Sequence, residues 1–384
     1  MKTSVYTIGE ICYRFSSGKN ITSNNIYEEG EYPVYGGNGL RGYTDKFNFQ
    51  GQCSIIGRQG AYCGNVRFFS GKGYMSDHAV VAVTTDEHDN RYFAYKLGLM
   101  DLGRFSGQAA QPGISVTKIA RLKVEMPPLS TQRRIASILS AYDNLIENNN
   151  KRIRLLEQMA ENLYKEWFVR FRFPEYEKTE FENGLPKGWK SMRIKELSRL
   201  KSGYAFKSEW FVEEGESVAK IKDIGGTLMD TSDLSNVNKI NCIKAKKFLL
   251  VEGNLTIALT GATIGKISIV PRHVGNIYTN QRLGKFFMGD KPIENLSFLY
   301  CLFKQEAMVS TIINISNSSS AQPNISPEQI ENIKIIGNKE VIAEFNETLK
   351  PMFSMILSIH SQNENLSRQR DLLLPRLMSG KLEV

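Results

Sequence analysis

Two long stretches of the chain place apolar side chains at the spacing of a coiled-coil helix. In residues 129–172 the apolar positions step by four and three, with Asn149 as the one polar member: Ile135, Leu139, Tyr142, Ile146, Ile153, Leu156, Ala160, Leu163 and Trp167. These steps put the side chains on one face of an α-helix. At about 1.5 Å per residue the helix would be roughly 65 Å long. We therefore expect a partner helix to cover its apolar face.

The C-terminal stretch supplies a partner with the same spacing. From Ile342 its repeat positions are Phe345, Leu349, Met352, Ile356, Ile359, Asn363, Leu366, Arg370, Leu373 and Leu377. Asn149 occupies a d position and Asn363 an a position, and a faces d only when two helices run antiparallel. Placing the two asparagines opposite each other also pairs Trp167 with Phe345. The pattern predicts an antiparallel coiled coil in which a buried asparagine pair fixes the register at some cost in stability.

Two prolines in the second helix keep an alternative open. Pro351 and Pro375 lie inside the expected helix, and an internal proline removes a backbone hydrogen bond and kinks or ends a helix. The second helix would then break near Lys350 and near Leu374, and each helix would pack on its own neighbouring domain.

A globular segment precedes each long helix, and the two segments resemble each other at three points in the same order. The matched segments are 17–18 with 202–203, 60–64 with 261–265, and 110–115 (AQPGIS) with 321–326 (AQPNIS). This order indicates a duplication. Short β-branched and aromatic runs broken by glycine predict α+β domains. We expect two similar domains joined by two long helices, with approximate two-fold symmetry and the domains at opposite ends of the rod, a geometry that suits duplex DNA.

These patterns divide the chain into four parts. They are a first domain at 1–128, a helical region at 129–174, a second domain at 175–338 and a C-terminal helical region at 339–384. Polar residues 175–186 form a linker, and the Ser/Asn-rich residues 314–320 are expected to form a loop.

Composition and charge narrow the function. The 384 residues are 41% hydrophobic and 23% charged, with no apolar run of membrane-spanning length and no N-terminal leader pattern, so we expect a cytoplasmic protein without a membrane partner. The five cysteines form no C-x-x-C pair, which argues against a zinc ribbon and a disulfide framework. A net charge of +9 favours a polyanionic partner. The charge is spread over 1–128, 129–172 and 173–338 at +3 each, so contacts would come from folded surfaces.

Motifs for catalysis or cofactor binding are missing from the sequence. Residues 261–267 (GATIGKI) are one residue too short for a P-loop and lack its hydroxyl. The four histidines show no ligand spacing, and no G-x-S-x-G, H-E-x-x-H or amino-methyltransferase tetrapeptide is present. We expect a non-catalytic chain with no metal and no cofactor of its own. The two GAxxG segments predict either tight turns or a backbone approach to phosphate.

Several longer motifs resemble the specificity subunits of type I restriction-modification enzymes. They are YPVYGGNGLRGY from Tyr32, AQPGIS and AQPNIS, PPLSTQRRIASIL from Pro127, LYKEWFVRF from Leu163, LPKGW from Leu185 and the C-terminal LLLPRLMSGKL. The resemblance implies that each domain reads one half of a split double-stranded DNA site and that the helices set the spacer. It also implies docking of two methylation subunits, which bind S-adenosylmethionine, and of restriction subunits that use ATP and Mg²⁺.

Side chains near the matched turns are the candidates for reading DNA. Arginine on guanine and glutamine on adenine are favoured in the major groove, whereas lysine and hydroxyl groups mostly hold phosphates. The candidates are Arg58, Gln59, His78, Arg104 and Gln108 in the first domain, and Thr260, Lys266, Arg282 and Ser319 in the second. For each of them the alternative is an ordinary solvated surface residue.

The leading rival function is a non-enzymatic, protein-binding coiled-coil adaptor. DNA binding predicts a steep loss of affinity with salt, because contacted phosphates release counterions, whereas an adaptor need not show this loss. Heptad flanks such as Tyr164, Phe168 and Phe353 suggest an exposed face that awaits helices from a partner.

Overall fold

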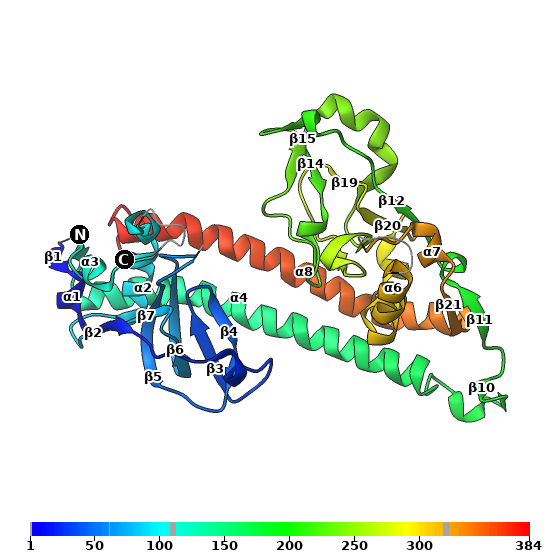
Figure 1. Ribbon diagram of the computed structural model, residues 1–384, viewed down its shortest axis with the longest axis horizontal. Coiled ribbons are helices and arrows are strands. Elements are labelled where there is room, and N and C mark those ends of the chain that lie inside the picture. The colour runs from blue at the N-terminus through cyan, green and yellow to red at the C-terminus, as the bar shows by residue number, and fades with distance from the viewer. Residues whose placement is uncertain (1, 61, 108–112, 318–322) are drawn as a thin grey trace. The chain divides into compact units, whose positions relative to one another are not determined.

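The computed structural model describes residues 2–60, 62–107, 113–317 and 323–384 (Figure 1). The chain forms two compact units, unit 1 comprising Met1–Glu147 with Asn365–Val384, and unit 2 comprising Asn148–Glu364. Each long helix contributes to both units. Gln108 and Ser319 lie outside the described residues.

Unit 1 is built on a six-stranded sheet with the strand order β2-β7-β5-β6-β3-β4. Its strands are β2 (Cys12–Ser17), β3 (Tyr32–Gly36), β4 (Gly39–Thr44), β5 (Phe49–Gly57), β6 (Val66–Met75) and β7 (Ala79–Thr84). A separate antiparallel pair joins β1 (Ser4–Thr7) to β8 (Lys123–Met126). The helices are α1 (Ile8–Ile11), α2 (Asn90–Gly98), α3 (Val116–Ala120) and the first part of α4 (Leu129–Tyr164).

The core of unit 1 joins the domain to the long helices. The α2 side chains Tyr92, Phe93 and Leu97 are buried in one cluster with Ile135 and Leu139 of α4. Leu377 and Met378 of the C-terminal helix belong to the same cluster. The expected coiled-coil face is therefore buried here by the domain as well as by the partner helix.

Unit 2 contains two larger sheets. The four-stranded sheet has the order β12-β20-β17-β18, and the five-stranded sheet has the order β13-β15-β14-β19-β16. The strands are β12 (Arg199–Ser202), β13 (Phe211–Val212), β14 (Glu216–Ala219), β15 (Ser235–Val237), β16 (Leu249–Leu250), β17 (Leu255–Ala258), β18 (Ile267–Ile269), β19 (Ile277–Thr279) and β20 (Leu283–Phe287). Two antiparallel pairs join β9 (Phe181–Glu182) to β10 (Leu185–Pro186) and β11 (Lys190–Arg193) to β21 (Lys334–Gly337).

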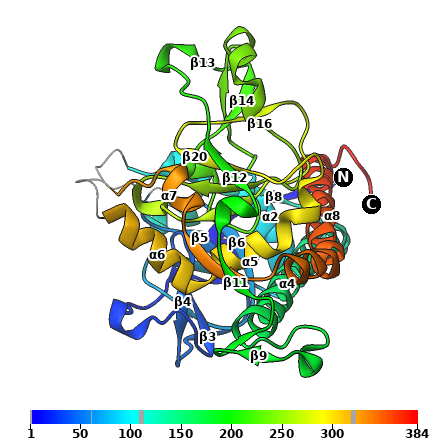
Figure 2. The same cartoon turned by 90° about the vertical axis from the view of Figure 1, so that its right-hand side faces the viewer.

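The helices of unit 2 cover the four-stranded sheet. They are α5 (Leu296–Lys304), α6 (Glu306–Asn317), α7 (Pro327–Glu331) and α8 (Lys339–Met378), the last of which continues into unit 1. In Figure 2, β13, β14 and β16 of the five-stranded sheet lie away from α5 and α6. The predicted loop at 314–320 is wrong for Asn314–Asn317, which form the last turn of α6.

A large aromatic cluster fastens the long helices to unit 2. After Tyr164, α4 continues as a π-helical turn at Lys165–Val169, and the wider turn buries two consecutive side chains, Trp167 and Phe168. Phe345 of α8 lies 5.3 Å from Trp167 and 5.1 Å from Phe168, measured between ring centroids. The expectation of exposed flanks is wrong, because Tyr164, Phe168 and Phe353 are all buried in this core.

The C-terminal helix is not broken by its prolines. α8 runs from Lys339 to Met378 through Pro351 and Pro375. Both prolines lie on the exposed side of the helix, where water can hydrate the carbonyl groups that lose a partner. The alternative of a helix broken near Lys350 and Leu374 is therefore wrong.

The α+β class, the two similar domains and the pair of long antiparallel helices are confirmed. Within the described residues no single helix is long and apolar enough to cross a membrane, although one helix pair bent by 73°, Pro292–Lys304 with Glu306–Asn317, meets the length and composition criteria.

Candidate nucleic-acid interface

In unit 1, three backbone segments are tied together where β5 ends. The Arg58 amide donates to the His78 carbonyl at 2.9 Å, and the Ile114 amide donates to the Arg58 carbonyl at 2.9 Å. The Gly64 amide closes the following turn on the Gly57 carbonyl at 2.8 Å. This turn, the loop after β6 and the segment before α3 thus meet around the backbone of one residue.

Unit 2 repeats this arrangement bond for bond. The Leu259 amide donates to the Arg282 carbonyl at 3.0 Å, and the Ile325 amide donates to the Leu259 carbonyl at 3.0 Å. The Gly265 amide closes the turn on the Ala258 carbonyl at 3.0 Å. Leu259 therefore occupies the place of Arg58, and Arg282 the place of His78.

The glycines that open and close the two GAxxG segments explain why both segments are tight turns. Gly60, Gly64, Gly261 and Gly265 have φ values of 84°, 91°, 77° and 80°, a region that only glycine adopts without strain. A Cβ atom at Gly60 would meet nothing within 4 Å, so this corner of the turn is open on its outer side.

A second close contact is also repeated in the two domains. The glycine after β2 packs against the end of β6 in unit 1, and the glycine after β12 packs against the end of β19 in unit 2. A Cβ atom at Gly18 would lie 2.1 Å from the Met75 carbonyl oxygen, and one at Gly203 would lie 2.1 Å from the Thr279 carbonyl oxygen. Neither position can hold a larger residue without backbone movement. The glycine of each matched Ser-Gly pair is thus required by close backbone packing.

The structure brings three of the five candidates in the first domain to one turn. Arg58 is half-buried, and its Nη1 donates to Ser17 Oγ at 3.3 Å and to the Asp77 carbonyl at 3.4 Å. Gln59 is exposed and forms a bridge with Gly113. The His78 side chain is 46% exposed, with Nε2 4.0 Å from an Asp77 carboxylate oxygen.

Of the remaining candidates of the first domain, one lies in a neighbouring turn and the other outside the described residues. Arg104 is exposed in the short 3₁₀ turn Leu102–Phe105, where its guanidinium lies 4.8 Å from the Phe105 ring centre. That turn contacts the GAxxG segment through Gly64, whose Cβ position is 2.2 Å from the Gly103 nitrogen. Gln108 lies outside the described residues.

In the second domain Thr260 and Arg282 lie at the repeated turn. Thr260 forms a bridge with Asn324, as Gln59 does with Gly113. Arg282 is exposed, and its backbone amide donates a hydrogen bond to Asn280 Oδ1 at 3.3 Å. Lys266 is exposed at the far end of the turn, and Ser319 lies outside the described residues. Each turn therefore presents at least one exposed side chain that can hydrogen-bond to a base edge or a phosphate.

The two asparagines of the coil meet within unit 2. Asn149 Nδ2 donates to Asn363 Oδ1 at 2.8 Å, and Asn363 Nδ2 donates to Asn150 Oδ1 at 2.9 Å. The exposed fractions of Asn149 and Asn363 are 1% and 8%, so both amides are satisfied away from water. Among the described residues no group of three or more His, Cys, Asp or Glu side chains could hold a metal ion.

Comparison with known proteins assigns the family. The model of the type I restriction modification DNA specificity domain matches residues 2–158 and 186–338, one copy in each half of the chain. The chain belongs to this family. The repeated turns described above fall one within each matched segment.

Two specificity subunits illustrate the relationship. The type I restriction enzyme EcoprrI specificity subunit of Escherichia coli is 36% identical over 160 residues, which is 41% of this chain and 40% of that protein. The MjaVIII specificity subunit of Methanocaldococcus jannaschii is 26% identical over 326 residues, covering 83% of this chain and 76% of that protein. Thus the match spans less than half of the first relative and about three quarters of the second.

A solved structure shares the fold. The type I restriction-modification system S subunit from M. genitalium superimposes with a TM-score of 0.61 at 18% sequence identity, covering 98% of this chain and 96% of that one. At this identity the similarity supports the fold alone.

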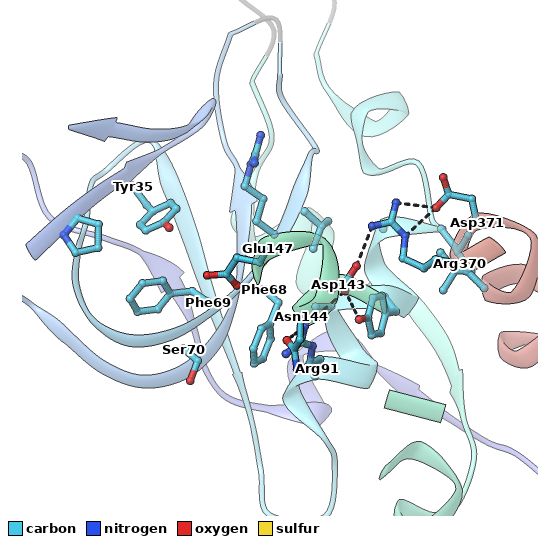
Figure 3. Close-up of a pocket in the computed structure, with 18 of the residues that line it drawn as sticks. Tyr35, Phe68, Phe69, Ser70, Arg91, Asp143, Asn144, Glu147, Arg370 and Asp371 are labelled. Carbon is cyan, nitrogen blue, oxygen red and sulfur yellow. Dashed lines mark hydrogen bonds and ion pairs between the residues drawn. The ribbon is translucent and has the colours of Figure 1, made fainter. Parts of the chain in front are cut away.

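In unit 1 of this specificity chain, a carboxylate that the sequence reasoning missed joins the domain to the coil. Asp143 of α4 accepts hydrogen bonds from the Tyr95 hydroxyl and from Arg370 Nη1, the latter at 2.8 Å (Figure 3). Arg91 Nη2 lies 3.6 Å from the same carboxylate. Burial and the hydrogen bond to Asp143 raise the pKa of Tyr95. These groups line a cavity of about 930 Å³ between β6, α2 and the two long helices.

Unit 2 uses Glu157 of α4 in the same way. Its Oε1 accepts hydrogen bonds from the hydroxyl groups of Tyr300 and Thr227, each at 2.5 Å. Tyr95 lies in α2 and Tyr300 in α5, so in each domain a helix after the sheet donates a tyrosine hydroxyl to α4. Neither carboxylate occupies an apolar heptad position, so the coiled-coil pattern gave no signal for them.

Side-chain amides on the long helices also accept hydrogen bonds from backbone groups of the domains. Asp89 N donates to Gln132 Oε1 at 2.9 Å, and Phe298 N donates to Asn346 Oδ1 at 2.8 Å. Gln132 and Asn346 are both buried. They are separated by the same number of residues as Asn149 and Asn363, which is consistent with duplication of the whole domain-and-helix unit.

Proposed function

We propose that this chain is the non-catalytic DNA-recognition subunit of a type I restriction-modification complex. Each of its domains reads one half of a bipartite double-stranded DNA site, and the two long helices fix the length of the spacer between the halves. The observation that carries the proposal is the repeated turn. The same backbone hydrogen bonds place exposed side chains at equivalent corners of two domains, in a chain of the DNA specificity family.

The partners follow from the same proposal. The chain docks two methylation subunits, which bind S-adenosylmethionine, and restriction subunits, which use ATP and Mg²⁺. The chain itself contributes DNA contacts and no reacting group.

Substitution at the two turns tests the proposal. Gln59→Ala and Arg282→Ala each remove an exposed side chain from one domain. The complexes with the methylation subunits are assayed for methylation of duplex libraries in which one half-site is randomised. We expect each variant to relax discrimination at a different half-site, with a loss of about 1–3 kcal/mol for the affected base pair.

Lys187→Gln is the control, because Lys187 is exposed, forms an ion pair with Glu180 and belongs to neither turn segment. Unchanged half-site preference in both turn variants would contradict the assignment of these turns. A binding constant that does not fall with salt would contradict DNA as the ligand and favour the protein-binding adaptor.

A further inference from the structure

Unit 2 carries an exposed helical ridge that has no counterpart of similar length among the described residues of unit 1. It is the ten-residue 3₁₀ helix Lys239–Phe248, visible as the yellow-green coil after β15 in Figure 1. The longest 3₁₀ segment described in unit 1 has four residues, Leu102–Phe105. We call Lys239–Phe248 the ridge.

The ridge has three rows of side chains, because a 3₁₀ helix has three residues per turn and residues i and i+3 are eclipsed. One row, Cys242, Ala245 and Phe248, is buried. It packs in a cluster with Phe206 and Tyr278, among others. Burial of this row in the hydrophobic cluster stabilises the unusually long 3₁₀ helix.

The other two rows face solvent with different chemistry. Ile240 and Ile243 are 73% and 70% exposed and share one row. Lys244 and Lys247 share the next row. Two isoleucines exposed to this degree, side by side, are unusual unless another molecule covers them.

The charge of the ridge favours a polyanion. Its ten residues include four lysines and no carboxylate. Lys239 lies 4.0 Å from Glu216, but among the described residues no carboxylate lies within ion-pair distance of Lys244, Lys246 or Lys247. Lys247 Nζ lies 5.2 Å from the centre of the Phe248 ring. A row of lysines without a carboxylate partner, beside an apolar row, can hold phosphates while the apolar side chains meet base edges, such as the methyl group of thymine.

The ridge is hydrogen-bonded to β19, the strand that leads to Arg282 at the repeated turn of unit 2. Thr279 Oγ1 at the end of β19 donates to the Phe248 carbonyl at 3.0 Å, and Arg282 follows three residues later. Lys285 Nζ donates to the Leu249 carbonyl at 2.6 Å just beyond the ridge. Ridge and turn are therefore connected through β19 and the residues that follow it.

We propose that the ridge is a second DNA-contacting element of unit 2, in which Lys244 and Lys247 bind backbone phosphates and Ile240 and Ile243 contact apolar base edges in a groove. The proposal rests on the DNA-recognition function proposed above. It adds a specificity determinant that has no match among the described residues of unit 1, and so an asymmetry between the two half-sites.

The test compares two double variants in the full complex with the methylation subunits, binding a cognate duplex over a range of salt concentrations. Lys244→Gln/Lys247→Gln is expected to reduce the magnitude of the slope of log K against log salt by about 1.8, which weakens binding at 0.1 M salt about 60-fold, with affinity at 1 M salt as the reference. Ile240→Ser/Ile243→Ser is expected to leave the slope unchanged. It should lower discrimination at one or two base pairs of a single half-site by on the order of tenfold.

Matched controls replace exposed lysines and an exposed apolar side chain elsewhere in unit 2. Lys190→Gln/Lys334→Gln deletes two exposed lysines on β11 and β21, and Val274→Ser changes a fully exposed apolar side chain. Both are expected to match the wild type. Co-purification with the methylation subunits shows that each variant is folded and assembled.

Three outcomes would overturn the inference. Ridge variants that bind like the controls would show that the ridge does not touch DNA, although a wild-type complex that still binds its site would leave the proposed function intact. Ridge variants that fail to assemble while remaining folded would assign the ridge to a protein partner. A wild-type complex without sequence-specific binding would refute the proposed function itself, and the inference with it.

Discussion

The buried asparagine pair provides a quantitative test of how the coil is specified. Asn149 donates to Asn363 at 2.8 Å, and Asn363 donates to Asn150 at 2.9 Å, four residues along each helix from the buried Ile153 and Ile359. Substituting Asn149→Ala leaves the Asn363 oxygen buried without its donor. An unsatisfied buried acceptor costs about 1–3 kcal/mol.

The double variant should behave differently from the sum of the single variants. Asn149→Ala/Asn363→Ala removes both amides, so no buried acceptor remains and only a small cavity is left. We expect a coupling free energy of about 1–2 kcal/mol in the double-mutant cycle. Leucine at both positions should raise stability, but several coil registers then become similar in energy, since the polar layer that selects one register is gone.

Hydrogen exchange of the α4 and α8 amides in unit 2 measures these free energies locally, which avoids the assumption that a two-unit chain unfolds in one step. Asn148 is exposed on α4, so Asn148→Ala serves as a control with a small expected effect. Single variants that add up in the double variant, or that leave exchange unchanged, would refute the role assigned to the pair.

Three further predictions concern each unit separately. Gly203→Ala places a Cβ atom 2.1 Å from the Thr279 carbonyl oxygen and should destabilise unit 2 by about 3 kcal/mol in urea unfolding. Tyr300→Phe removes a hydrogen bond to the Glu157 carboxylate and should cost about 1.5–3 kcal/mol without changing the fold, as judged by circular dichroism. Burial lowers the pKa of His88 below its ordinary value of 6.5, so folded unit 1 binds fewer protons than the unfolded chain, and its stability should fall as the pH drops below about 6.5. His88→Gln should flatten that part of the curve, and an equal pH slope in variant and wild type would contradict this assignment.

The coil was predictable because a long heptad pattern is a strong signal. A single polar residue at an a or d position of such a pattern indicates a buried polar pair that fixes the register. Asn149 and Asn363 alone determined the direction and the register. Pro351 and Pro375 argued against a continuous helix, but the sequence alone does not reveal that both face solvent. Phe168 was misjudged because a π-helical turn, which rotates consecutive side chains inward, leaves no trace in a heptad count.

The candidate site was only partly accessible from the sequence. The repeated motifs located both turns, because glycines at positive φ and at close backbone contacts cannot be replaced without strain. Which exposed side chain touches DNA depends on the docked geometry, and the sequence carries no periodic signal for that. The links made by Asp143 and Glu157 were missed for a similar reason, since a single polar residue beside a heptad looks like any solvated residue.

The ridge has a spacing of apolar residues that is visible in the sequence. Its sequence KINCIKAKKF has buried residues three apart, the period of a 3₁₀ helix rather than of an α-helix or a strand. A period of three matches neither a strand nor an α-helix, so the usual periods of 2 and 3.6 do not reveal this segment.

The most direct test of the central claim is a map of methylated bases in the host genome, with and without this gene and with Arg282→Ala in its place. If the chain sets the specificity of a type I complex, deletion removes adenine methylation from one split motif of fixed spacer, and Arg282→Ala relaxes one half of that motif while the other half and the spacer stay unchanged. A methylation map identical in all three strains would contradict the account.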